Sequence, residues 1–285
     1  MGITSRKSMQ VDSIISNPIT EEIRLKGHQS IRFTPDGFSV LVSDASYRPV
    51  FLSQYGYDTT IPVHLHAGEC ERVLKEKDLL EFEGESVFIV DSAAVTSIPR
   101  QCFSENLARD LLEKAANIEE RDQVHSRFVR DRNIFLVFSV PHEIHELQEK
   151  FTGPVKVMHT SECLVSLSDQ VQASDHQRGV ILAEVQQFTL DLLVIKEDGV
   201  RLLNRYALKD PSDYIYHTLN TVRQLNLDRE SVPVYLSGII HGEHELFGLL
   251  GKYIRNVKST PYYLESLSRR QVLHYMILSE GSKCA

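Results

Sequence analysis

The sequence predicts an α/β protein built from two copies of one unit, each with the element order βββαβαβα. The first observation behind this prediction is a repeated β-rich segment. Residues from 30 onward align without a gap onto residues from 180 onward, so that Ile31 meets Ile181 at a shift of 150 residues. The second observation is an apolar strand followed by a histidine-containing helix start, found at 135–147 and again at 234–246, where His142 meets His241 at a shift of 99 residues.

Each β-rich segment is typical of a three-strand meander, because short runs of β-branched and aromatic residues are separated by turn-forming residues. The first meander spans 30–55 and the second spans 180–208. Apolar residues at helical spacing then predict helices in both copies. These predicted helices cover 104–115, 142–151 and 161–171 in the first copy and 211–225, 243–255 and 268–280 in the second, although 268–280 also fits a strand.

The two shifts also predict the domain organisation. The fall in shift from 150 to 99 places about 51 additional residues in the first copy. We assign part of them to an insertion at about 57–103, between the third strand and the first helix, and the rest to a longer connection at 117–132. The predicted divisions are an N-terminal extension at 1–27, a first domain at 28–175 and a second domain at 176–285.

Composition excludes several classes of protein. The chain of 285 residues has 31 Lys and Arg against 39 Asp and Glu, a formal net charge of −8, which argues against binding nucleic acid through bulk charge. No apolar run approaches the roughly 18 residues that a membrane span requires. Residues 1–26 contain no signal-peptide core, and the cysteines form no CxxC pair. We therefore expect a cytoplasmic protein with reduced thiols and no membrane span.

The duplicated unit, together with the apolar strand 234–238 that leads into a loop and a helix, resembles the actin-like ATPase superfamily. This superfamily includes actin, the Hsp70 ATPase domain, sugar kinases and the assembly proteins of type IV pili and type II secretion. The whole chain is also similar to an uncharacterised Bacteroidetes family of this fold, known only as a domain of unknown function. The resemblance covers about 28–280 and implies two RNase H-like domains that flank a cleft.

The resemblance also implies where a nucleotide would bind. In this superfamily the first hairpin of each copy carries an Asp-x-Gly-Thr/Ser loop, in which Asp positions a metal ion and water, and Gly lets backbone N–H groups approach phosphate. The alignment places the first loop at 34–37, with Thr34 at the Asp position and Asp36 at the Gly position. Asp36 and Gly37 then favour an ordinary hairpin turn.

The other two nucleotide loops also depart from the superfamily pattern. In the second hairpin Glu184 retains a carboxylate, but Gln186 replaces the glycine. After the strand 234–238 one glycine remains and is followed by Ile239 and Ile240. If a nucleotide binds, the candidate contacts are Asp36, Gly37, Glu184, Gln186, Thr189, Ser237 and Gly238. Because all three loops are altered, we expect no cofactor, and ATP with magnesium is the alternative.

The histidine motifs are the remaining candidates for chemistry. His142-Glu143-Ile144-His145 is one residue short of the HExxH zinc motif, and His241, His244 and Glu245 form a similar group in the second copy. Their occurrence at equivalent places favours helix starts in a repeated unit. We therefore expect no metal site.

The sequence thus predicts a non-catalytic scaffold, a pseudo-ATPase that acts by contacting an unknown protein partner, with the insertion 57–103 as a contact surface and no catalytic residues. The first alternative is an ATP-binding protein or small-molecule kinase in which Glu184 replaces the phosphate-loop Asp. A weaker alternative is a metal-dependent hydrolase at the repeated histidines.

Overall fold

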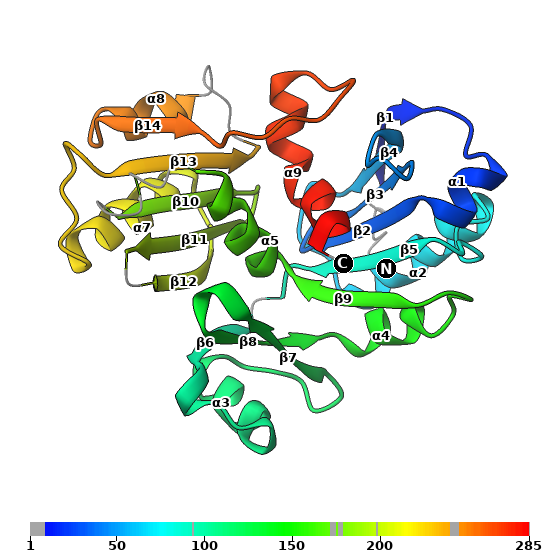
Figure 1. Cartoon of the computed structure of the whole chain (residues 1–285), viewed down its shortest axis with the longest axis horizontal. Helices are drawn as coiled ribbons and strands as arrows, with labels where there is room; N and C mark the ends of the chain where they lie inside the picture. Colours follow the sequence, from blue (N-terminus) through cyan, green and yellow to red (C-terminus); the bar gives the residue numbers. More distant parts are fainter. Residues whose placement is uncertain are drawn as a thin grey trace, which may run out of the picture.

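The computed structural model describes residues 9–92, 94–171, 175, 179–197, 199–239 and 245–284, and it contains three β-sheets. A six-stranded first sheet and a five-stranded second sheet lie on either side of helix α9, and a three-stranded small sheet lies below them in the view of Figure 1. The α/β class and the duplicated RNase H-like unit predicted from the sequence are confirmed.

The first sheet has the strand order β1-β4-β3-β2-β5-β9. Its strands are β1 Gln10–Ser16, β2 His28–Thr34, β3 Gly37–Ser43, β4 Pro49–Gly56, β5 Glu85–Val90 and β9 Val155–His159. The predicted meander forms β2, β3 and β4, which pair antiparallel, while β5 and β9 extend the sheet in parallel with β2. Strand β1 comes from the predicted N-terminal extension and pairs with β4.

The second sheet repeats this arrangement with the order β12-β11-β10-β13-β14. Its strands are β10 Val180–Val185, β11 Thr189–Lys196, β12 Gly199–Ala207, β13 Pro233–Gly238 and β14 Asn256–Ser259. The antiparallel meander is again extended by two parallel strands, β13 and β14. Strands β10, β13 and β14 are therefore the counterparts of β2, β5 and β9.

The described helices include three pairs at equivalent places in the two halves. These helices are α1 Glu21–Lys26, α2 Val63–Glu76, α3 Ala108–Ala115, α4 His142–Gln148, α5 Thr160–Leu167, α7 Pro211–Gln224, α8 Glu245–Gly251 and α9 Arg269–Cys284. By element order α7, α8 and α9 correspond to α2, α4 and α5. The predicted segment 268–280, which fitted helix or strand, is helical. None of the helices among these described residues is long and apolar enough to cross a membrane.

The small sheet corrects the predicted insertion. Its order is β6-β8-β7, from β6 Val95–Pro99, β7 Gln123–Val129 and β8 Ile134–Val140, and α3 packs on it. The additional residues therefore lie between β5 and α4, and the predicted position of about 57–103 is wrong. Most of that range instead holds α2 and β5, which belong to the repeated unit, and only its last part, with β6, belongs to the insertion. The apolar run at 135–140 is part of the small sheet, because a buried strand has the same local pattern whichever sheet it joins.

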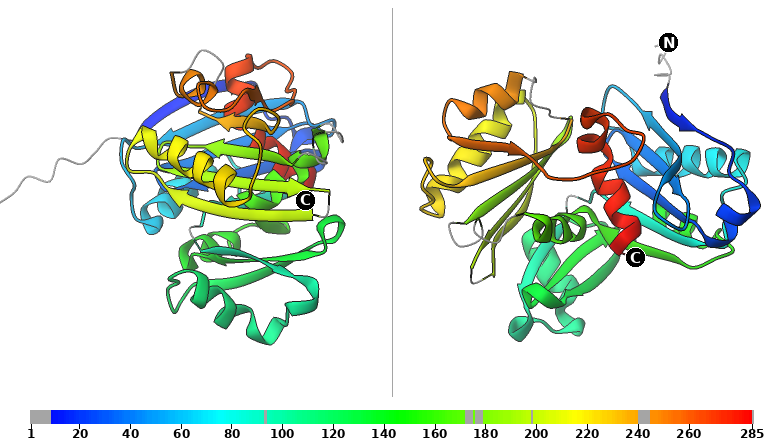
Figure 2. Two further views of the ribbon diagram at one scale, coloured as in Figure 1. Left: turned by 90° about the vertical axis from the view of Figure 1, so that its left-hand side faces the viewer. Right: turned by 45° about the horizontal axis from the view of Figure 1, so that its top comes forward.

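The two halves share one hydrophobic core. Helix α9 contacts β2 and β5 of the first sheet as well as β13 of the second, and α5 contacts β11 (Figure 2). A Cβ atom on Gly281 of α9 would lie 2.3 Å from the Ile89 side chain, so the helix approaches β5 closely. Buried residues of this core come from both sheets, including Leu52, Ile89 and Leu182. Each half therefore supplies its last helix to the junction between the sheets.

Candidate functional site

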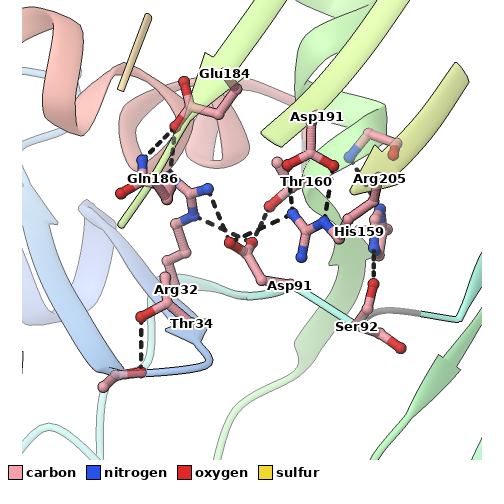
Figure 3. Close-up of polar contacts among 12 residues, drawn as sticks. Arg32, Thr34, Asp91, Ser92, His159, Thr160, Glu184, Gln186, Asp191 and Arg205 are labelled. Carbon is pink, nitrogen blue, oxygen red and sulfur yellow. Dashed lines mark hydrogen bonds and ion pairs between the residues drawn. The ribbon is translucent and has the colours of Figure 1, made fainter. Parts of the chain in front are cut away.

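A cluster of five charged residues with buried side chains lies where the two halves meet (Figure 3). We call it the ion cluster. It consists of Arg32 on β2, Asp91 just after β5, Glu184 on β10, Asp191 on β11 and Arg205 on β12. Charged side chains are rarely buried unless they are paired, so each member of the cluster needs a partner of opposite charge.

Arg32 joins the two halves directly. Its Nη1 donates to Glu184 Oε1 at 2.9 Å, across the junction between the sheets. Its Nε and Nη2 donate to the two carboxylate oxygens of Asp91 at 3.2 and 2.9 Å. This second contact is bidentate, the geometry in which a guanidinium binds a carboxylate most specifically. The Arg32 side chain is 4% exposed, and those of both acids are fully buried.

Arg205 makes the second set of cross-links. Its Nε and Nη2 donate to Asp191 at 2.8 and 2.6 Å on the neighbouring strand. Its Nη2 also lies 3.4 Å from Asp91 Oδ2, so Asp91 sits between two guanidinium groups from opposite halves. The cluster holds three carboxylates and two guanidinium groups.

The protonation behaviour of the three acids follows from this arrangement. Burial alone raises the pKa of Asp91, but Arg205 and Arg32 outweigh it and lower that pKa to about 2. Burial raises the pKa of Glu184 and of Asp191, and in each case this exceeds the opposing effect of the arginine that pairs with the acid, Arg32 and Arg205 respectively. Asp91 is therefore the acid that the cluster holds most firmly in its charged form.

Helix α5 begins against the cluster. His159 caps it, with Nδ1 accepting from Ser161 N at 3.0 Å and Nε2 donating to Ser92 O at 3.0 Å. Thr160 Oγ1 donates to Asp91. Burial and, secondarily, Arg205 lower the pKa of His159 to about 3. His159 is therefore a neutral imidazole with its proton on Nε2.

The first predicted nucleotide loop is an ordinary hairpin. Thr34 Oγ1 donates to Gly37 O at 3.2 Å across the turn. A Cβ atom on Gly37 would lie 2.0 Å from Tyr55 O on β4, so strand packing accounts for this glycine. Burial raises the pKa of Asp36. The loop holds none of the ion-cluster residues.

The second predicted loop is tied to the cluster. Gln186 Nε2 donates to Glu184 Oε1 at 2.6 Å, the same oxygen that Arg32 reaches. The backbone N–H of Gln186 donates to Thr189 O at 2.8 Å and closes the hairpin. In the third loop Ser237 Oγ donates to Ala183 O at 3.3 Å.

Gly238 has a structural role that needs no nucleotide. Its φ is +91°, in the region that favours glycine, and a Cβ atom there would lie 2.0 Å from Val185 O. The strand β13 can leave the second sheet beside β10 only because this position has no side chain.

A cavity of about 290 Å³ lies between the first predicted nucleotide loop, which contains Asp36, and the second, which contains Gln186. Asp36 and Gln186 line it from opposite halves, together with Arg32, Ile239 and His274 of α9. The other five candidate contacts do not line it. The structure thus brings two of the seven predicted residues to one cavity.

The predicted histidine groups behave as helix-surface residues where they are described. His142 and His145 lie 3.2 and 3.5 Å from Glu146 and Glu149 along their own helix. The second group, around His241 and His244, falls outside the described residues. Within the described part of the chain, no three His, Cys, Asp or Glu side chains are grouped so as to hold a metal ion.

Four members of the ion cluster were missed by sequence reasoning: Arg32, Asp91, Asp191 and Arg205. A signal for two of them was present, since Arg32 stands between Ile31 and Phe33 and Asp191 between Leu190 and Leu192. A charge inside an otherwise apolar strand indicates a buried partner. The sequence does not identify that partner, because the pairing crosses the junction between the sheets.

The geometry and topology together define a protein of the actin-like ATPase fold. The chain belongs to the family described as "Protein of unknown function (DUF3822)", whose model matches residues 20–257. A search of curated proteins found no match.

Two solved structures illustrate the likeness in fold. A Bacteroides thetaiotaomicron protein with an actin-like ATPase fold and unknown function is 18% identical, with a TM-score of 0.77 over 94% of this chain and 100% of that one. The type IV pilus biogenesis complex PilM-PilN is 12% identical, with a TM-score of 0.58 over 92% and 98% of the two chains.

Proposed function

We propose that this protein is a non-catalytic scaffold or interaction protein, in which buried ion pairs join the two halves beside the place where an active relative holds nucleotide. The observation that carries the proposal is the Arg32 guanidinium, which is 2.9 Å from both Glu184 and Asp91. A carboxylate that holds Mg²⁺ must offer a free oxygen lone pair. Glu184 Oε1 accepts from both Arg32 and Gln186, and only Oε2 has no hydrogen-bond partner, so a magnesium ion would have to bind at Oε2 beside the Arg32 guanidinium.

The surrounding charges oppose magnesium as well. A divalent cation beside Glu184 would face the Arg32 guanidinium at short range, where like charges repel strongly in a buried site. The side chains of Gln186 and Ile239 enter the cavity between the loops, where a working phosphate loop presents bare backbone. These features support the interpretation that side chains of the protein occupy the place where a phosphate group would bind.

If the protein does not bind nucleotide, we propose that it acts by binding another protein. The PilM-PilN complex is a protein of similar fold bound to another protein. Beside the small sheet, Leu107 is 49% exposed, and on β7 Phe128 is 38% exposed. We therefore place a partner-binding role on the insertion, now located between β5 and α4.

The cavity of about 290 Å³ between the hairpins favours one alternative, binding of ATP or a small-molecule substrate. Titration calorimetry with ATP and Mg²⁺ at millimolar concentration decides between the two functions. The expected result is no saturable heat for the wild type, for Glu184→Gln or for the exposed control Glu230→Gln. Stoichiometric binding that Glu184→Gln abolishes and Glu230→Gln preserves would establish the nucleotide-binding alternative.

A further inference from the structure

A second cavity, of about 340 Å³, lies between the first sheet and the inserted segment. We call it the insertion cavity. Its apolar lining includes Phe33 at the end of β2, Val90 at the end of β5, Ile61 before α2, and Pro141 and Ile144 at the start of α4. Phe33, Val90 and Ile144 are buried, so the floor of the cavity is part of the packed core. The volume is sufficient for one or two apolar side chains.

The charged residues that line this cavity are all acidic. Its charged lining residues are Asp91, Glu119 and Asp122, and no described lysine or arginine lines it. Arg32 and Arg205 already neutralise Asp91. Glu119 and Asp122 lie between α3 and β7. The negative charge of Glu143 on α4 repels the carboxylate of Asp122.

One described cation lies beside the acidic rim, because Arg109 donates to the main-chain oxygen of Asp122, but the guanidinium of Arg109 pairs with Glu113. Among the described residues, Glu119, Asp122 and Glu143 form no ion pair. Burial, and then the charges of Glu119 and Glu143, raise the pKa of Asp122. A cation delivered from outside would therefore relieve repulsion among these three carboxylates. An apolar floor beside an uncompensated acidic rim is complementary to a ligand that carries an apolar group next to a positive charge.

We propose that the insertion cavity is the docking site for an extended segment of a partner protein that carries one or two apolar side chains beside a lysine or arginine. The apolar side chains would occupy the floor formed by Phe33, Val90 and Ile144, and the cation would face Glu119 and Asp122. Leu65, in the same first turn of α2 as the lining residue Val63, is 47% exposed and offers apolar surface beyond the cavity. This inference rests on the proposed scaffold function and names the chemistry of its partner.

The test uses a phage library of random decapeptides, selected on the full chain. The expected result is enrichment of sequences with an apolar residue next to lysine or arginine. A synthetic peptide of the enriched sequence should lose at least tenfold in affinity when Thr60→Trp, at an exposed lining position, fills the mouth of the cavity. The double reversal Glu119→Lys and Glu143→Lys should shift the selection toward acidic peptides, whereas the exposed control Glu265→Lys should not.

Enrichment that is unchanged by Thr60→Trp, a lack of preference for basic residues, or no enrichment at all would each overturn the docking proposal. Thermal unfolding of every variant shows whether it is folded. Failure here is distinguishable from failure of the scaffold function, because the latter is decided by ATP titration. A silent ATP titration with no peptide selection leaves a scaffold that uses another surface, whereas saturable ATP binding removes the scaffold function itself.

Discussion

The two halves of the molecule repeat one arrangement of strands and helices, but the corresponding strands β2 and β10 carry buried charges of opposite sign. Strands β2 and β10 both open a meander and both pair in parallel with the next strand of the unit. Yet β2 presents Arg32 and β10 presents Glu184, and these two side chains pair at 2.9 Å. Corresponding strands of the two halves therefore bind each other through one charged pair, whereas an active relative would present an acidic loop from each half toward one metal-bound nucleotide.

The number of ion pairs in the cluster does not measure how much the cluster stabilises the fold. Removing charges from water is costly, so a buried pair adds little net stability compared with apolar residues of the same size. Loss of one partner is different, because the remaining charge is left buried without compensation. The cluster thus favours one relative placement of the halves.

The largest expected effect comes from breaking the contact between the halves. Arg32→Met removes the cation that pairs with both Glu184 and Asp91, and it should lower the free energy of unfolding by about 3–5 kcal/mol. The double variant Arg32→Met with Glu184→Met should recover part of this loss, because it also removes one of the two carboxylates that are left without the Arg32 cation. Urea unfolding measures both. Arg72→Met, at an exposed ion pair on α2, is the control and should cost under about 1 kcal/mol. Equal effects at Arg32 and Arg72 would contradict the proposed coupling.

A second effect sharpens the comparison of the loops. Gly238→Ala should destabilise the protein by about 3 kcal/mol, because its Cβ atom would meet Val185 O and because φ is +91°. Gly199→Ala is the control, because the backbone φ of Gly199 is also positive, at +117°, but no atom lies within 4 Å of the position of a Cβ atom there. It should cost only about 1 kcal/mol. Thermal unfolding of the two variants measures the difference, and equal costs would remove the structural explanation of Gly238.

The smallest effect concerns the histidine beside the cluster. The pKa of His159 is lowered to about 3, while an unfolded histidine titrates near 6.5, so the unfolded chain binds the proton first. The stability that neutral His159 contributes is complete above pH 6.5 and falls as the pH drops toward 3. His159→Asn keeps a capping acceptor without the titration.

Between pH 7 and pH 5 the wild type should therefore lose about 2 kcal/mol more than His159→Asn. Urea unfolding at the two pH values measures this. His274, whose pKa burial lowers to about 4, is present in both proteins and cancels in the comparison. Parallel pH profiles would show that His159 is not held neutral by the fold.

Much of the fold could be predicted from the sequence because its signals are local. The turn Pro35-Asp36 and the apolar strands around it fix a hairpin wherever they occur, and the repeated spacing reveals the duplication. Sequence reasoning failed in assigning the strand after the first meander. Both 85–90 and 134–140 are apolar runs, and only their hydrogen-bonded neighbours distinguish β5 in the first sheet from β8 in the small sheet.

The sequence by itself determined that this is a duplicated α/β protein, and it predicts altered residues in the three loops that the resemblance assigns to nucleotide binding. Only the tertiary structure decided that Arg32 pairs with Glu184, 152 residues further along the chain, and that α9 packs against the first sheet. It also placed a cavity with an apolar floor and acidic rim residues beside the insertion. The physical reason is one of range. Periodicity and turn preference act over a few residues, whereas charge pairing and burial depend on neighbours that the chain brings together only when it folds.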